Sequence, residues 1–183
     1  MKRLFFLLFL VLPFFVQAQK ASTQEVLLQL VKNLHGGVEL HTVDGRQSYY
    51  VYGGTGYKYY FHKQTYFFPQ IDFKWGQYRY DTNSSNYTET SSLAFPLIVG
   101  YDLPMKDIIT ANIYGGARYE QILYVSHNTY TSKVNKAQTG LLGGATIKIA
   151  NRFGITVSYY YGLTSLYNDG TGKTSSFNFA FLF

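Results

Sequence analysis

The residues of this sequence that could perform hydrolytic chemistry are Ser126, His127 and Asn128, which are adjacent, and Glu120, which lies shortly before them. A serine hydrolase needs a base within hydrogen-bond reach of its nucleophile and a third group that orients the base. Adjacent residues in a polar loop seldom achieve that arrangement. We therefore expect no catalytic site and a protein that is not an enzyme.

The sequence also lacks the residue patterns that are typical of metal sites and of nucleic-acid binding. His35, His41 and His62 are scattered without the spacing of a metal site, so we expect neither a metal nor another cofactor. The net charge is +6, but the basic residues form no run, and we expect no nucleic-acid partner. Mild positive charge suits either anionic lipopolysaccharide or ordinary solvated loops.

Segment 64–80 alternates between two faces with the period of a β-strand. One face carries Phe67, Pro69, Ile71, Phe73 and Trp75, and the other carries Phe68, Gln70, Asp72, Lys74 and Gly76. The apolar face could meet the core of a soluble sandwich or the lipid around a transmembrane barrel. One strand alone does not distinguish these folds.

The whole set of strands does distinguish them. Similar alternation recurs in segments 33–43, 49–61, 91–103, 108–124, 137–150, 153–164 and 175–183. These lengths suit strands that cross a bilayer at a tilt, which takes about 9–11 residues. The connections alternate between short (62–64, 104–106, 151–152) and long (82–89, 125–136, 165–174). The pattern predicts an all-β fold, an eight-stranded antiparallel transmembrane β-barrel of the outer membrane, with both termini in the periplasm.

Aromatic residues support this orientation. Those expected at the two membrane interfaces, as an aromatic girdle, are Tyr59, Phe61, Phe67, Trp75, Tyr101, Phe153, Tyr161, Phe181 and Phe183. Trp75 and Tyr161 fall near long loops, whereas the other seven fall near short turns.

The inward faces carry four acidic and four basic residues. They are Glu39, Lys58, Asp72, Lys74, Asp102, Arg118, Glu120 and Lys148. An eight-stranded barrel is just wide enough for side chains to fill it, so balanced charges favour a closed, salt-bridged lumen over a conduit. Arg118 and Glu120 are expected to pair with Asp72 and with Lys74 or Lys148.

The N-terminus has the layout of a cleaved signal peptide over residues 1–18. Lys2 and Arg3 precede an apolar run that is too short to span a membrane as a helix. Residues 19–32 form a periplasmic segment, and 33–183 the barrel domain. In this segment Ser22 and Glu25 resemble a capping box, so a short helix and an extension of the first strand both remain open.

Two stretches resemble a known family. Residues 92–97, Ser-Leu-Ala-Phe-Pro-Leu, and 160–164, Tyr-Tyr-Gly-Leu-Thr, are similar to segments of the small outer-membrane β-barrel family of porin-like proteins that includes PorT-type members. The similarity covers roughly residues 33–183, although Ala94 replaces an inward glutamate common in the family. The terminal Phe183 is similar to the aromatic that barrel-assembly machinery recognises.

The resemblance implies an outer-membrane protein of the Gram-negative cell envelope, in contact with lipid and lipopolysaccharide, but it implies no activity. We expect a structural or interaction role through the external loops. A narrow porin for small solutes and an accessory protein of a secretion system are the alternatives.

Overall fold

The computed structural model describes residues 23–79, 87–103, 105, 108–126, 134–150, 153–168 and 170–183. The expected signal peptide, residues 1–18, lies outside the described residues, as do Ser22, His127 and Asn128.

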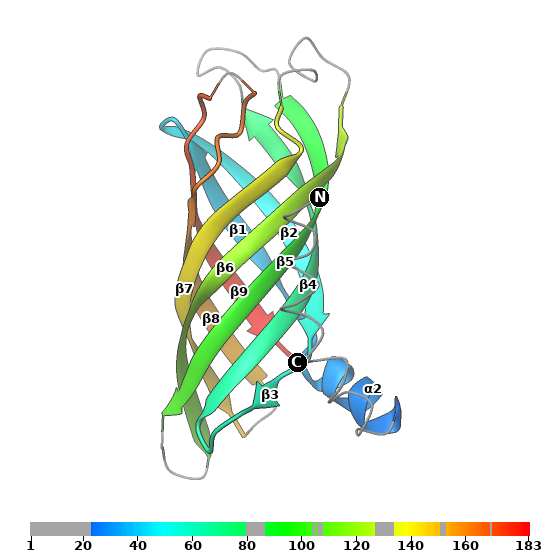
Figure 1. The fold of residues 1–183 in the computed structure, drawn as a ribbon, viewed down its shortest axis with the longest axis vertical. Helices are drawn as coiled ribbons and strands as arrows, with labels where there is room; N and C mark the ends of the chain where they lie inside the picture. The colour runs from blue at the N-terminus through cyan, green and yellow to red at the C-terminus, as the bar shows by residue number, and fades with distance from the viewer. Residues whose placement is uncertain are drawn as a thin grey trace, which may run out of the picture.

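Within these residues the chain forms helix α2 followed by strands (Figure 1). The elements are α2 (Thr23–Lys32), β1 (His35–Val43), β2 (Arg46–Gly56), β3 (Tyr59–Tyr60), β4 (Thr65–Arg79), β5 (Tyr87–Leu103), β6 (Ile109–Val125), β7 (Ala137–Ile149), β8 (Phe153–Gly162) and β9 (Thr174–Leu182). Within the described residues, no helix is long and apolar enough to cross a membrane.

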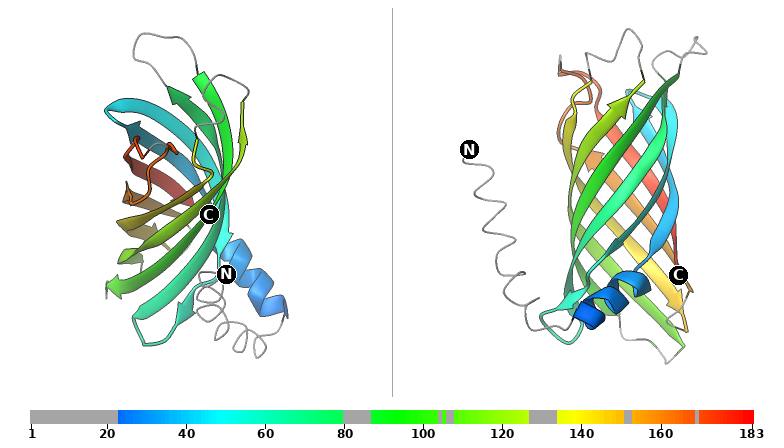
Figure 2. Two further views of the ribbon diagram at one scale, coloured as in Figure 1. Left: turned by 45° about the horizontal axis from the view of Figure 1, so that its top comes forward. Right: turned by 90° about the vertical axis from the view of Figure 1, so that its right-hand side faces the viewer.

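The strands form a closed antiparallel barrel. Neighbours follow the order β2-β1-β9-β8-β7-β6-β5-β4-β3, and a further pairing of β2 with β4 closes the sheet. The first and last strands are neighbours, with Val38 opposite Phe179. Both β2 and β3 pair with β4, so β3 continues β2 as one interrupted strand. Counted this way, the barrel wall consists of eight strands, here called its eight walls, as predicted. Figure 2 shows this closure from two further directions.

The expected strand 49–61 differs from the observed one at both ends. It begins earlier, at Arg46, because Asp44 and Gly45 form a two-residue hairpin turn with φ angles of 48° and 80°. An Asp-Gly pair suits such a turn, since both central residues need positive φ. The strand is also interrupted between Gly56 and Tyr59, where Lys58 forms an ion pair with Asp102.

The alternating faces predicted from the sequence are confirmed. Apolar side chains such as Phe73, Val157 and Phe179 are exposed on the outer surface, whereas polar side chains such as Lys74 and Asn178 are buried inside. This reverses the arrangement of a soluble protein. Apolar side chains on the exterior are stable where they contact the hydrocarbon of a membrane. The closed sheet also satisfies the backbone hydrogen bonds of every strand, which a membrane requires.

Of the N-terminal segment, for which the sequence left two alternatives, the described residues 23–32 are helical. Helix α2 covers Thr23–Lys32, with Glu25 in its first turn and Lys32 in its last. Both charges oppose the partial charges of the helix ends. The helix lies outside the barrel wall, at the end that also carries β3 and the C-terminus (Figure 1).

Candidate functional site

The lumen holds a compact cluster of four of the predicted charges, Glu39, Lys74, Arg118 and Glu120, here called the lumen cluster. Lys74 Nζ lies 2.9 Å from Glu39 Oε2 and 2.8 Å from Glu120 Oε2. Arg118 Nη1 lies 3.0 Å from Glu39 Oε2, and its Nη2 lies 3.3 Å from Glu120 Oε2. Two carboxylates therefore share two cations, and all four residues are buried.

The lumen cluster spans the bore. Glu39 is on β1 and Arg118 is on β6, and three strands separate β1 from β6 in either direction around the barrel. Arg118 also donates from Nη2 to Glu39 Oε1 at 3.1 Å, which makes the contact bidentate. Side chains from opposite walls therefore meet in the middle of the lumen.

Neutral side chains complete the hydrogen bonding of the two carboxylates. Ser92 Oγ donates to Glu120 Oε1 at 2.6 Å, and Ser176 Oγ donates to Glu39 Oε1 at 2.7 Å. The Tyr160 ring lies 3.6 Å from the guanidinium carbon of Arg118. These contacts matter because a buried charge is tolerated only when its partners replace the lost water.

The partners within the lumen cluster differ in part from those expected. Glu120 contacts Lys74, as the sequence suggested, but Arg118 contacts Glu39 rather than Asp72. Asp72 lies 2.9 Å from His35 Nε2 instead. Which inward residues meet depends on which strands face each other across the bore, and alternation along one strand carries no such information.

The other predicted charges lie toward the end with the short turns. Lys58 Nζ lies 2.9 Å from Asp102 Oδ1, and the Tyr60 hydroxyl also donates to this carboxylate. Lys148 lines the same part of the lumen.

A cavity of about 90 Å³ lies on this side of the lumen cluster. Glu39, Lys74 and Arg118 contribute to its lining, together with Asp72 and Lys148. A space of this size with many polar partners can hold several water molecules.

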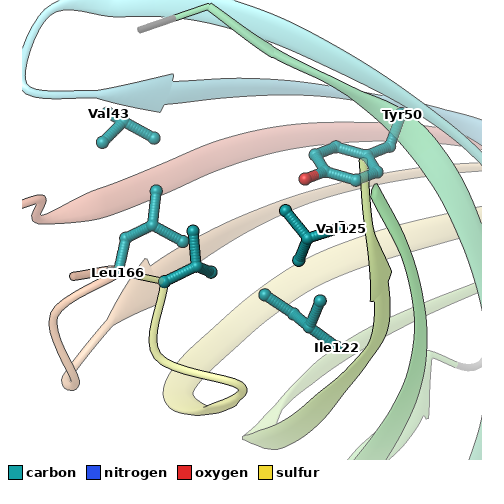
Figure 3. Packing of buried hydrophobic residues seen from close by; sticks show 6 residues of the cluster. Val43, Tyr50, Ile122, Val125 and Leu166 are labelled. Carbon is teal, nitrogen blue, oxygen red and sulfur yellow. The ribbon is translucent and has the colours of Figure 1, made fainter. Parts of the chain in front are cut away.

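A cluster of buried apolar residues, here called the plug, lies in the lumen on the other side of the lumen cluster (Figure 3). It consists of Val43, Tyr50, Ile122, Val125, Val134 and Leu166. Val134 and Leu166 come from the segments between strands, and the Asn135 amide donates to the Leu166 carbonyl at 2.7 Å. The plug is not apparent in the sequence, because its loop residues are isolated apolar positions within polar segments. The hydroxyl of Tyr50 is within 2.9 Å of Thr90 Oγ1, so its polar end is satisfied.

Two of the residues considered for hydrolysis, Glu120 and Ser126, lie within the described part of the chain, and each has other contacts. Glu120 belongs to the lumen cluster, whereas Ser126 Oγ accepts a hydrogen bond from the Glu89 amide at 3.0 Å. His127 lies outside the described residues. In the part of the chain that the structure describes, no group of three or more His, Cys, Asp or Glu side chains could hold a metal ion.

The predicted girdle residues lie on the outer surface or close to it. Phe61, Trp75, Tyr101, Phe153, Tyr161, Phe181 and Phe183 are exposed, whereas Tyr59 and Phe67 are half-buried and opposite each other in the sheet.

A closed antiparallel barrel with an apolar exterior and a paired polar interior defines the class of small transmembrane β-barrels. Residues 27–168 match the family described as the outer membrane protein beta-barrel domain. The chain belongs to this family, and the resemblance to small outer-membrane barrels is thereby confirmed. The protein is located in the outer membrane. No curated protein matches the sequence.

Solved structures with the same fold include an enzyme. The outer membrane enzyme PagL is 14% identical, with 80% of this chain and 97% of that chain covered and a TM-score of 0.54. Neisserial surface protein A (NspA) is 11% identical, with 81% and 92% covered and a TM-score of 0.53. At these identities the likeness shows the fold alone.

Proposed function

We propose that this protein is a closed, non-enzymatic barrel that acts as a structural or interaction protein through its external loops. The observation that carries the proposal is the direct contact between Glu39 and Arg118, which come from opposite walls of the barrel.

The energetic reason is the burial of the four charges. A solute or ion that passes must separate the lumen cluster, and leaving one member of a buried ion pair without its partner costs about 3–5 kcal/mol. It must also displace the apolar plug, which includes the fully buried Tyr50 and Leu166. The charged lumen cluster and the apolar plug would therefore oppose passage one after the other, which favours a lumen that does not conduct.

A non-enzymatic role is supported by the separation of the hydrolytic candidates. The Glu120 carboxylate is occupied by Lys74, Arg118 and Ser92. It is therefore not free to orient a base for Ser126. Since a solved barrel of the same fold is an enzyme, the proposal depends on these contacts rather than on the fold.

The proposed partners are the outer-membrane lipid, lipopolysaccharide and the barrel-assembly machinery. Exposed basic residues near the end that carries the plug, Lys136 and Lys173 among them, suit the anionic groups of lipopolysaccharide. Phe183 extends from β9 with its ring two-thirds exposed, so it is accessible to a machinery that recognises a terminal aromatic.

Conductance in planar bilayers tests the closed lumen. We expect no steady conductance from the purified wild-type protein, and none from the Ser158→Ala variant, whose substitution lies in the lumen but outside the lumen cluster. Steady wild-type conductance whose ion preference changes in a normally folded Arg118→Ala variant would contradict the proposal. The narrow porin would then replace it.

The narrow porin is the second candidate, and the polar cavity beside the lumen cluster is the observation in its favour. The accessory role in secretion depends only on the resemblance to PorT-type members. A deletion strain with normal secretion would exclude that role without affecting the closed lumen.

A further inference from the structure

Helix α2 carries an apolar stripe that the described part of the chain leaves largely exposed. Leu27, Leu30 and Val31 have the i, i+3, i+4 spacing that places them on one side of the helix, and Leu34 follows two residues after the helix ends. Leu27 is 57% exposed, Val31 61% and Leu34 46%, and none of the helix residues is buried. Lys32 lies about 140° around the helix from Leu27, because five residues at about 100° each separate them.

Hydrogen bonds fix the helix against the outside of the barrel. The buried Asn33 donates from Nδ2 to the Gln29 carbonyl at 2.9 Å and to the Gly56 carbonyl at 3.2 Å. Thr55 Oγ1 donates to the Leu30 carbonyl. The C-terminal end of the helix is thus joined to the end of β2.

The stripe continues the lipid-facing surface of the barrel. The Phe183 amide donates to the Leu34 carbonyl at 3.2 Å, so the end of the stripe adjoins the C-terminal aromatic. Phe183 itself and Phe61 of the neighbouring hairpin are exposed on the outside. Figures 1 and 2 show α2 outside the wall, running across rather than along the long axis of the barrel.

We propose that α2 is an interfacial helix that binds the phospholipid surface of the periplasmic leaflet, with Leu27, Val31 and Leu34 inserted among the lipids. A short amphipathic helix with a polar opposite side lies in the plane of the interface rather than spanning the membrane. Lipid is the occupant because the same leaflet already surrounds the barrel residues that adjoin the stripe.

Quenching of a single tryptophan by brominated lipid tests this proposal. The chain has one tryptophan, so Trp75→Phe gives a background without it. Leu27→Trp and, as the matched control, Lys32→Trp are then added to the full chain, which is folded into vesicles of phosphatidylcholine brominated near the headgroup. Slower mobility after boiling on a gel verifies that each variant is folded, and Val31→Trp replaces Leu27→Trp if the latter does not fold.

We expect the tryptophan on the stripe to lose at least about half of its emission in brominated vesicles, and the control to lose much less. The loss should not depend on the protein-to-lipid ratio. Equal quenching at the two positions would overturn the proposal. Quenching on the stripe that falls as the protein density rises would also overturn it, because a second copy of the chain would then cover the helix.

Discussion

Arg118 is the side chain on which the lumen cluster depends, because it contacts both carboxylates and packs against the Tyr160 ring. Gly140 makes that packing possible. A Cβ atom at Gly140 would lie 2.3 Å from Tyr160, so any larger residue would push the ring toward the guanidinium. The position of one cation therefore relies on a residue that has no side chain.

Replacement of Arg118 by Met tests the energetic role of the lumen cluster. It leaves two buried carboxylates with Lys74 as their shared cation, so we expect the free energy of unfolding to fall by about 3–5 kcal/mol. Urea titration in lipid vesicles, followed by Trp75 fluorescence, measures the change. Lys148→Met is the matched control, because Lys148 lines the lumen outside the cluster, and a smaller loss is expected. Equal losses would mean that the lumen cluster has no special role.

At the scale of the elements, the alternation of apolar and polar residues was sufficient to find all eight strands of the barrel and the direction of their side chains. The reason is that lipid favours apolar side chains and the lumen favours polar ones, and successive residues of a strand face these two sides in turn. The turn at Asp44 and Gly45 was not predicted, although an Asp-Gly pair is typical of a two-residue hairpin, because the segment before residue 49 is too polar to be recognised as strand. The plug was not readable, since burial of Val134 and Leu166 depends on how two loops pack over the bore.

Neighbouring residues on β8 give a direct test of the two faces. Val157 is exposed on the outside, whereas Ser158 faces the lumen and accepts a hydrogen bond from Asn178 Nδ2 at 3.2 Å. We expect Val157→Lys to destabilise the barrel by about 2–4 kcal/mol, the cost of a cation at the bilayer midplane. Ser158→Ala should have a much smaller effect. The fraction that resists unfolding on an unheated gel measures both variants, and an undisturbed Val157→Lys barrel would refute the lipid-facing assignment.

At the scale of the whole molecule, the short turns and the plug mark opposite ends of the barrel, and the short turns are expected in the periplasm. The native chain contains no cysteine, so single cysteines report the orientation. Lys173 and Lys63 are both exposed, the former beside the Asp44 turn and the latter in the hairpin before β4.

We expect a membrane-impermeant maleimide added to intact cells to label Lys173→Cys but not Lys63→Cys. Both variants should react after the cells are broken, which controls for intrinsic reactivity. Labelling of Lys63→Cys alone in intact cells would mean that the barrel has the reverse orientation and that α2 lies in the outer leaflet.

The bidentate contact between β1 and β6 also constrains the order of folding. Glu39 and Arg118 meet only when strands far apart in the sequence have both entered the bilayer. Before that, Glu39 has Lys74 as its partner within the first half of the chain, and Arg118 has Glu120 on its own strand. Each half can therefore enter the membrane with its charges paired, and the bidentate contact is expected to form last, when the seam between β1 and β9 closes.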